Sequence, residues 1–95
     1  MYQIIRTPIE GATGKAVPMP DIDDYRKIQE EGRLEELNAK RVIIYERKSF
    51  GEIKECLQKL SENPHAVTVE WGKGRRAINA TRADGRQFRF RIVKK

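Results

Sequence analysis

Apolar and polar side chains alternate along residues 66–95, and two glycine-containing turns interrupt the alternation. A period of two is typical of β-strands with one buried face, so we expect three antiparallel strands in this segment. The first turn contains Gly72, Lys73 and Gly74. A two-residue loop at Lys73-Gly74 predicts three cross-strand pairs, namely Trp71 with Arg76, Val69 with Ile78, and Val67 with Ala80.

The second turn decides which side chains of the last strand face the core. A two-residue loop at Asp84-Gly85 would pair Thr81 with Phe88 and place polar groups on the core side. A three-residue loop, Ala83-Asp84-Gly85, with Gly85 in the left-handed conformation of a bulge, pairs Ala80 with Phe88 instead. The hydrophobic effect favours this longer loop. It creates one apolar face consisting of Val67, Val69, Trp71, Ile78, Ala80, Phe88, Phe90 and Ile92.

A helix at 49–62 is the natural cover for that face. Ser49 and Glu52 have the spacing of a capping box, in which each side chain binds the other residue's free backbone N–H group. The apolar residues that follow recur on one side of a helix, and they are Phe50, Ile53, Leu57 and Leu60, with Cys56 beside them as a small core residue.

The preceding segment 41–46 is rich in β-branched residues and predicts a strand. A right-handed βα crossover would bring it parallel to one edge of the three-stranded meander. Residues 2–6 predict a further, edge strand. We therefore expect one α+β domain over 1–95, with a two-layer β-α-β-β-β core at 41–95.

The amino-terminal part predicts an arm and an acidic helix. Residues 9–20 combine glycines and prolines and read as a surface loop following the strand, so 1–20 forms a strand and arm. A helix at 21–38 should start at Asp21 as its cap and weaken or break at Gly32.

Positive charge is concentrated at the carboxyl-terminal end. The chain has a formal net charge of +6, and residues 71–95 contain nine Lys or Arg with Asp84 as the one acidic residue. Such asymmetry is typical of proteins with an anionic partner, although strands also carry basic residues for solubility and edge protection.

The predicted register assigns a polar outer face opposite the apolar one. Its rows place Glu70 beside Ala77 and Arg91, Thr68 beside Asn79 and Arg89, and Ala66 beside Thr81 and Gln87. With the basic residues around this face, the candidate nucleic-acid-binding residues are Arg75, Asn79, Thr81, Arg82, Arg86, Gln87, Arg89, Arg91, Lys94 and Lys95. Alternatively, the helix at 21–38 covers the face and its acidic side chains pair with Arg89 and Arg91.

Other chemistry has little support in the sequence. His65 has no second ligand at metal spacing, and no carboxylate pair or nucleophile stands out for catalysis. The segment GATGK lacks the flanking residues of a phosphate-binding loop. We expect no metal, no cofactor, no small-molecule substrate and no membrane span, and the single cysteine favours the reducing cytoplasm.

Three functions therefore compete. The first is a small non-enzymatic module that binds duplex backbone or structured RNA, since the outer face lacks aromatic residues on which single-stranded bases could stack. The second is a protein-interaction module that binds an acidic protein surface, such as a phage or mobile-element inhibitor or adaptor. The third, a small nuclease, lacks an acid–base pair. The oligomeric state stays open at this point.

Overall fold

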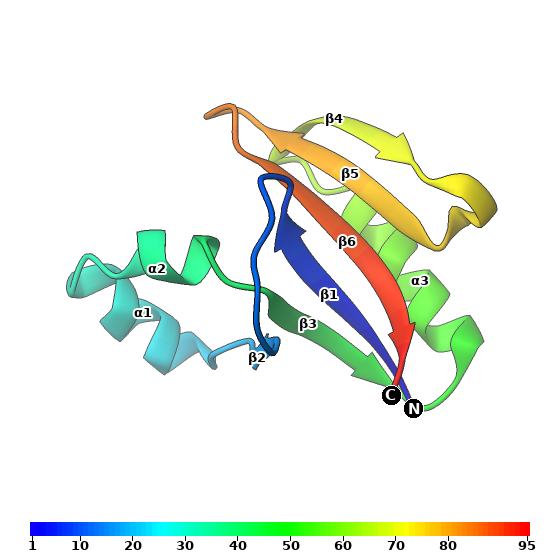
Figure 1. Cartoon of the computed structure of the whole chain (residues 1–95), viewed down its shortest axis with the longest axis horizontal. Coiled ribbons are helices and arrows are strands. Elements are labelled where there is room, and N and C mark those ends of the chain that lie inside the picture. The colour runs from blue at the N-terminus through cyan, green and yellow to red at the C-terminus, as the bar shows by residue number, and fades with distance from the viewer.

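The computed structural model covers all 95 residues and consists of a six-stranded sheet with one long helix behind it (Figure 1). The elements in chain order are β1 (Tyr2–Pro8), β2 (Val17–Pro18), α1 (Ile22–Glu30), α2 (Leu34–Asn38), β3 (Val42–Arg47), α3 (Phe50–Ser61), β4 (Ala66–Trp71), a short 3-10 turn (Lys73–Arg75), β5 (Ala77–Arg82) and β6 (Gln87–Lys94). The expected mixed α+β class is confirmed.

The strand order in the sheet is β2-β3-β1-β6-β5-β4. Strand β2 pairs in parallel with β3, whereas all other neighbours are antiparallel. Strand β2 lies inside the segment 9–20 that the sequence predicted to be a loop. It has only two residues, which is too short for an alternating pattern to be recognised in the sequence.

Strand β1 is central, so the prediction of an edge strand is wrong. It lies between β3 and β6 and separates them, which also means that β3 does not join the edge of the meander. The physical reason lies in consecutive apolar residues: Ile4 and Ile5 point to opposite faces of the sheet, and both are buried. A strand that needs cover on both faces belongs in the middle of a sheet.

The predicted register of the second turn is confirmed. Ala80 pairs with Phe88 and Ile78 with Phe90, and Gly85 has the left-handed φ of 87°. The Gly85 N–H group donates to the carbonyl oxygen of Arg82 at 3.0 Å, which closes the three-residue loop. Phe88 is accordingly buried and Phe90 half-buried.

The predicted register of the first turn is wrong by two residues. Trp71 pairs with Ile78 and Val69 with Ala80, because the turn is longer and contains left-handed Gly74 and Arg75. A shift of two keeps each side chain on its predicted face. The helix nevertheless does not cover two of the predicted core residues of β4. Val67, which lies at an irregularity in the pairing, is 66% exposed, and Trp71 is 36% exposed. Both residues belong to the edge strand β4, whereas α3 packs against β3, β1, β5 and β6.

The helices begin where the sequence predicts. The Asp21 carboxylate accepts a hydrogen bond from the Asp24 N–H at 2.8 Å and caps α1. The expected break falls at Gly32, which has a φ of 72°, and splits 21–38 into α1 and α2. The Ser49 hydroxyl caps α3 by accepting from the Glu52 N–H at 3.2 Å, but the reciprocal bond of a full capping box is not formed.

The main core lies between α3 and the sheet. Its buried members are Ile4, Ile53, Cys56, Leu57 and Ile78. The half-buried side chains packed around them include Tyr45, Val69, Phe90 and Ile92. The first and last strands, β1 and β6, cross the centre of this core side by side, and the Lys95 N–H donates to the Met1 carbonyl oxygen at 2.9 Å (Figure 1).

Candidate nucleic-acid interface

Five of the ten predicted binding residues share the outer face of the sheet, opposite α3. They are Asn79, Thr81, Gln87, Arg89 and Arg91. Along β5 and β6 they form three rows, which pair Thr81 with Gln87, Asn79 with Arg89, and Ala77 with Arg91. The two-residue shift of β4 corrects the outer neighbours, so that Glu70 lies beside Asn79, and Thr68 beside Thr81.

The central strand β1 adds residues that the sequence reasoning did not place on this face. Thr7 pairs with Arg89 and Ile5 with Arg91 on the side away from β5. The signal was present in the strongly β-prone run at 2–6, but its pairing partner in β6 is far away in the sequence. Arg89 and Arg91 thus lie on a strand that is paired on both sides, with β5 and with β1, and both side chains are exposed.

A shallow hollow of about 200 Å³ lies on the outer face between the two arginines. It is lined by Gly72, Ala77, Asn79, Arg89 and Arg91. The small residues form its floor: a Cβ atom at Gly72 would lie 3.2 Å from the Ala77 carbonyl oxygen and would crowd it. The Arg89 Nε atom donates to the Asn79 side-chain oxygen at 3.1 Å, which holds the guanidinium and leaves its terminal nitrogens to bind other groups.

Three other predicted residues lie away from this face. Arg82 points to the α3 side, with its guanidinium 4.5 Å from the centre of the Phe88 ring. Lys94 lies opposite Tyr2 on the α3 side as well. Arg75 lies in the β4–β5 connection and stacks over Trp71 at 4.6 Å. Arg75, Arg82 and Lys94 therefore do not share the outer face with Arg89 and Arg91.

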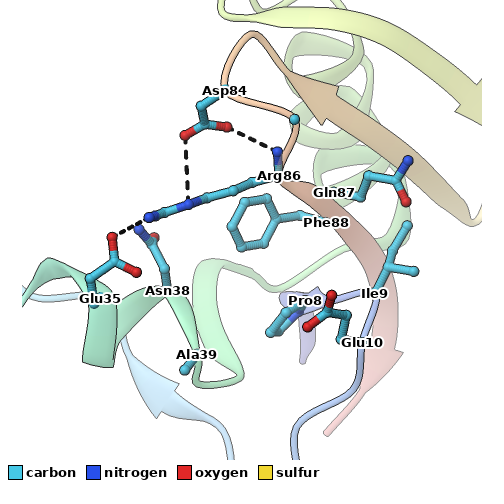
Figure 2. Close-up of a pocket in the computed structure, with 11 residues that line it drawn as sticks. Pro8, Ile9, Glu10, Glu35, Asn38, Ala39, Asp84, Arg86, Gln87 and Phe88 are labelled. Atoms are coloured by element: carbon cyan, nitrogen blue, oxygen red, sulfur yellow. Dashed lines mark hydrogen bonds and ion pairs between the residues drawn. The ribbon is translucent and has the colours of Figure 1, made fainter.

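The last two predicted residues are engaged with carboxylates. The Nζ atom of Lys95 lies 3.9 Å from Glu46, which also accepts a hydrogen bond from the side chain of Gln3 at 2.7 Å. Arg86 forms ion pairs with Glu35 of α2 and Asp84 of the turn (Figure 2). The hydrogen bond to Glu35 is the main cause that raises the pKa of Arg86.

Arg86 lies at an open groove of about 440 Å³ between α2, the end of β1 and the β5–β6 turn (Figure 2). Three carboxylates line it, those of Glu10, Glu35 and Asp84. Because two of them bind Arg86, the groove does not present a basic surface. No three His, Cys, Asp or Glu side chains in the chain lie close enough to share a metal ion.

Arg6 is a buried cation without a partner. Its side chain is on the α3 side of the sheet, 5% exposed, 5.0 Å from the centre of the Phe88 ring, and it forms no ion pair. Its Nε and Nη2 atoms are enclosed and make no hydrogen bond. Burial first, and repulsion by Arg82 second, lower the pKa of Arg6 to about 10.

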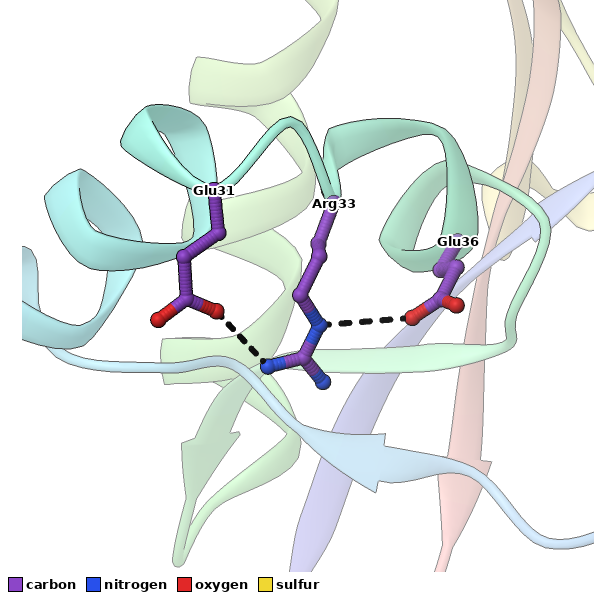
Figure 3. A network of polar contacts seen from close by, with 3 residues as sticks. All are labelled: Glu31, Arg33 and Glu36. Carbon is purple, nitrogen blue, oxygen red and sulfur yellow. Dashed lines mark hydrogen bonds and ion pairs between the residues drawn. The ribbon is translucent and has the colours of Figure 1, made fainter.

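The acidic helices do not cover the outer face, so the alternative in which they pair with Arg89 and Arg91 is wrong. Helices α1 and α2 lie to one side of the sheet in Figure 1, and α1 contains no buried residue. Their acidic side chains are partly engaged near the helix break, where Arg33 binds Glu31 at 3.2 Å and Glu36 at 3.5 Å (Figure 3).

A comparison of the chain with protein-family models, with curated proteins and with solved structures found no match in any of the three. No helix of the structure has both the length and the hydrophobicity needed to cross a membrane.

Proposed function

We propose that this protein is a small, non-enzymatic nucleic-acid-binding module that holds the phosphodiester backbone on the outer face of its sheet. The observation that carries the proposal is the exposed hollow between Arg89 and Arg91, with Asn79 beside them and a floor of Gly72 and Ala77. Guanidinium groups bind phosphate oxygens through two parallel hydrogen bonds. The fixed Nε–Asn79 bond orients Arg89 toward such a ligand.

The form of the nucleic acid follows from what surrounds the arginines. No aromatic side chain lies on the outer face of β4, β5 or β6, because Trp71, Phe88 and Phe90 belong to the other side. Single-stranded bases would therefore lack a stacking surface. Duplex backbone or structured RNA fits this face better, with Thr and Gln side chains available to phosphate and sugar.

The expected salt dependence is modest. Arg89 and Arg91 supply about two phosphate contacts on this side of the sheet. At a slope of about 0.9 per contact, affinity should fall roughly 10-fold between 50 and 200 mM salt. All nine basic residues of 71–95 acting together would give a far steeper fall.

A charge-reversal experiment tests the proposal. Binding of a fluorescent DNA duplex and an RNA hairpin is titrated at 50 and 200 mM salt for the parent chain and for the variant Arg89→Glu, Arg91→Glu. The control variant Lys40→Glu, Lys59→Glu has the same change in net charge at two exposed sites outside β4, β5 and β6. Loss of binding in the first variant alone is expected. Equal losses in both variants, or no binding by the parent at 50 mM salt, would refute the proposal.

A second candidate is a protein-interaction module, which we propose on a different observation. Helix α1 projects from the domain with Ile22 70% exposed and Tyr25 beside it, and acidic residues surround them. Such a surface suits a protein partner, as in an inhibitor or adaptor of a phage or mobile element. Co-purification of one stoichiometric protein with the parent, but not with Ile22→Glu, would support it.

The buried free thiol of Cys56 is compatible with the reducing cytoplasm, where we expect the protein to act.

A further inference from the structure

Strand β4 leaves one edge of the sheet open. The Gly72 N–H donates to the Ala77 carbonyl oxygen at 2.8 Å and closes the β4–β5 ladder. Hydrogen-bonded pairs alternate with non-bonded pairs in an antiparallel ladder. The pairs Val69–Ala80 and Trp71–Ile78 are therefore non-bonded, and the backbone N–H and C=O groups of Val69 and Trp71 point outward, away from β5.

This edge lacks most of the usual protection. Natural edge strands are blunted by lysine, proline, β-bulges, inward-pointing charges or very short length. Strand β4 is six residues long, contains no lysine or proline, and has Glu70 as its one charge; the irregularity between Ala66 and Thr68 is its one protective feature of this kind. It also exposes Val67 and Trp71. The opposite edge is different, because β2 has two residues and one of them is Pro18.

We propose that β4 pairs antiparallel with β4 of a second copy of this chain, in a symmetric dimer centred on Val69. In this register Val67 of each copy lies opposite Trp71 of the other, so the two exposed apolar side chains of β4 cover each other twice. Aromatic and β-branched residues are favourable cross-strand partners. The outward-pointing backbone N–H and C=O groups of Val69 and Trp71 form hydrogen bonds with the second copy as well.

Charge selects this register over its neighbours. With Val69 at the centre, Glu70 lies opposite Thr68 of the other copy, so no like charges face each other. A register centred on Glu70 would oppose the two Glu70 carboxylates directly, which is destabilising. A register centred on Thr68 would place Trp71 opposite His65, which lies before the strand begins.

The fold leaves room for the second copy. Helix α3 packs mainly against β3, β1, β5 and β6, and it leaves Val67 and Trp71 exposed on the helix side of β4. The same two-fold operation puts both outer faces on one side of a continuous sheet. An interface confined to one strand pair is at or below the roughly 1,200 Å² of a standard-size contact, so we expect a dimer that dissociates on dilution.

Single cysteine substitutions test the register. In the proposed dimer the two Val69 Cα atoms face each other at about 5.5 Å, within the range of a disulfide. The two Val67 Cα atoms are roughly 14 Å apart along the strands, beyond that range. Under mild oxidation Val69→Cys should form a covalent dimer at least tenfold faster than Val67→Cys. The parent is the control for Cys56, which is buried.

Sedimentation equilibrium tests the dimer itself. At 150 mM salt, the average mass of the parent should rise with concentration from 11.1 kDa toward twice that value. Val67→Lys should stay monomeric, whereas Thr13→Lys, with the same added charge on an exposed loop, should dimerise like the parent. A parent that stays monomeric up to millimolar concentration overturns the proposal. Equal cross-linking of Val67→Cys and Val69→Cys, or equal dimerisation of the two lysine variants, overturns it as well.

Discussion

Replacing Arg6 with methionine should stabilise the protein. The guanidinium is nearly enclosed, two of its nitrogens have no hydrogen-bond partner, and no carboxylate pairs with it. A buried charge without a partner costs free energy that an apolar side chain of similar length does not. Methionine also adapts its shape to irregular core spaces, so the loss of packing should be small.

The size of the effect follows from the pKa of Arg6, which is lowered to about 10. This value is well below the pKa of an ordinary arginine, and each pKa unit is worth about 1.4 kcal/mol. Keeping Arg6 charged in the folded state therefore costs about 3 kcal/mol. The cation–π contact with Phe88 offsets about 1 kcal/mol of this cost. We expect Arg6→Met to raise the free energy of unfolding by about 2 kcal/mol near neutral pH.

Urea unfolding followed by circular dichroism measures the effect. A gain of about 2 kcal/mol should raise the urea midpoint by about 1 M. Arg91→Met is the matched control, since that arginine is exposed and its replacement should change stability by less than about 0.5 kcal/mol.

The pH dependence gives a second check on Arg6. Its folded-state pKa is below its unfolded-state value, so the cost is fully present below about pH 10 and decreases as the pH rises above it. The stability gap between Arg6→Met and the parent should therefore narrow above pH 10. A variant that is less stable than the parent by 1 kcal/mol or more would refute the reasoning, because it would mean that Arg6 has a stabilising partner.

Two further predictions concern the ends of α3 and β5. Ser49→Ala should lower the free energy of unfolding by about 1 kcal/mol, because the Glu52 N–H loses its acceptor, while Ser49→Asp should keep the cap; urea titration distinguishes the two. Gly85→Ala should cost about 1–2 kcal/mol, since Gly85 has a φ of 87° and the cost lies in the backbone, with open space around its Cβ position. Gly51→Ala is the control, with the opposite sign: this helical glycine also has open space, and alanine should stabilise α3 by up to about 1 kcal/mol. If both glycine variants were destabilised equally, the backbone explanation would fail.

Local patterns predicted the parts of the fold that depend on nearby residues. The alternation of apolar and polar residues, together with Gly85, was enough to predict the β5–β6 register. A one-residue slip of β6 would have moved Phe88 from the core face to the solvent face. The first turn was not predictable in the same way. It requires Arg75 at a φ of 56°, a conformation that arginine rarely adopts and that no sequence signal marks. The position of β1 depends on pairing with β6 across the whole chain, which a local pattern does not encode.

The candidate interface was likewise predictable where it depends on nearby residues, and not where it depends on residues far away in the sequence. Alternation alone placed Asn79, Arg89 and Arg91 together, and the structure confirms this grouping. The same alternation, applied strictly, also assigns Arg82 and Lys94 to the α3 side, where they are found. The ion pair between Arg86 and Glu35 could not be predicted, because Glu35 lies in a helix far away in the sequence.

The pairing of β1 with β6 has a consequence for how the protein is made. Strand β1 is synthesised before the other five strands, yet its neighbour β6 is synthesised after them. The nascent chain must keep Ile4 and Ile5 without their β6 partners until β6 has been translated. Long-range pairing of this kind slows folding and leaves one edge of β1 unpaired in the meantime, so the centre of the sheet cannot be completed before β6 is present.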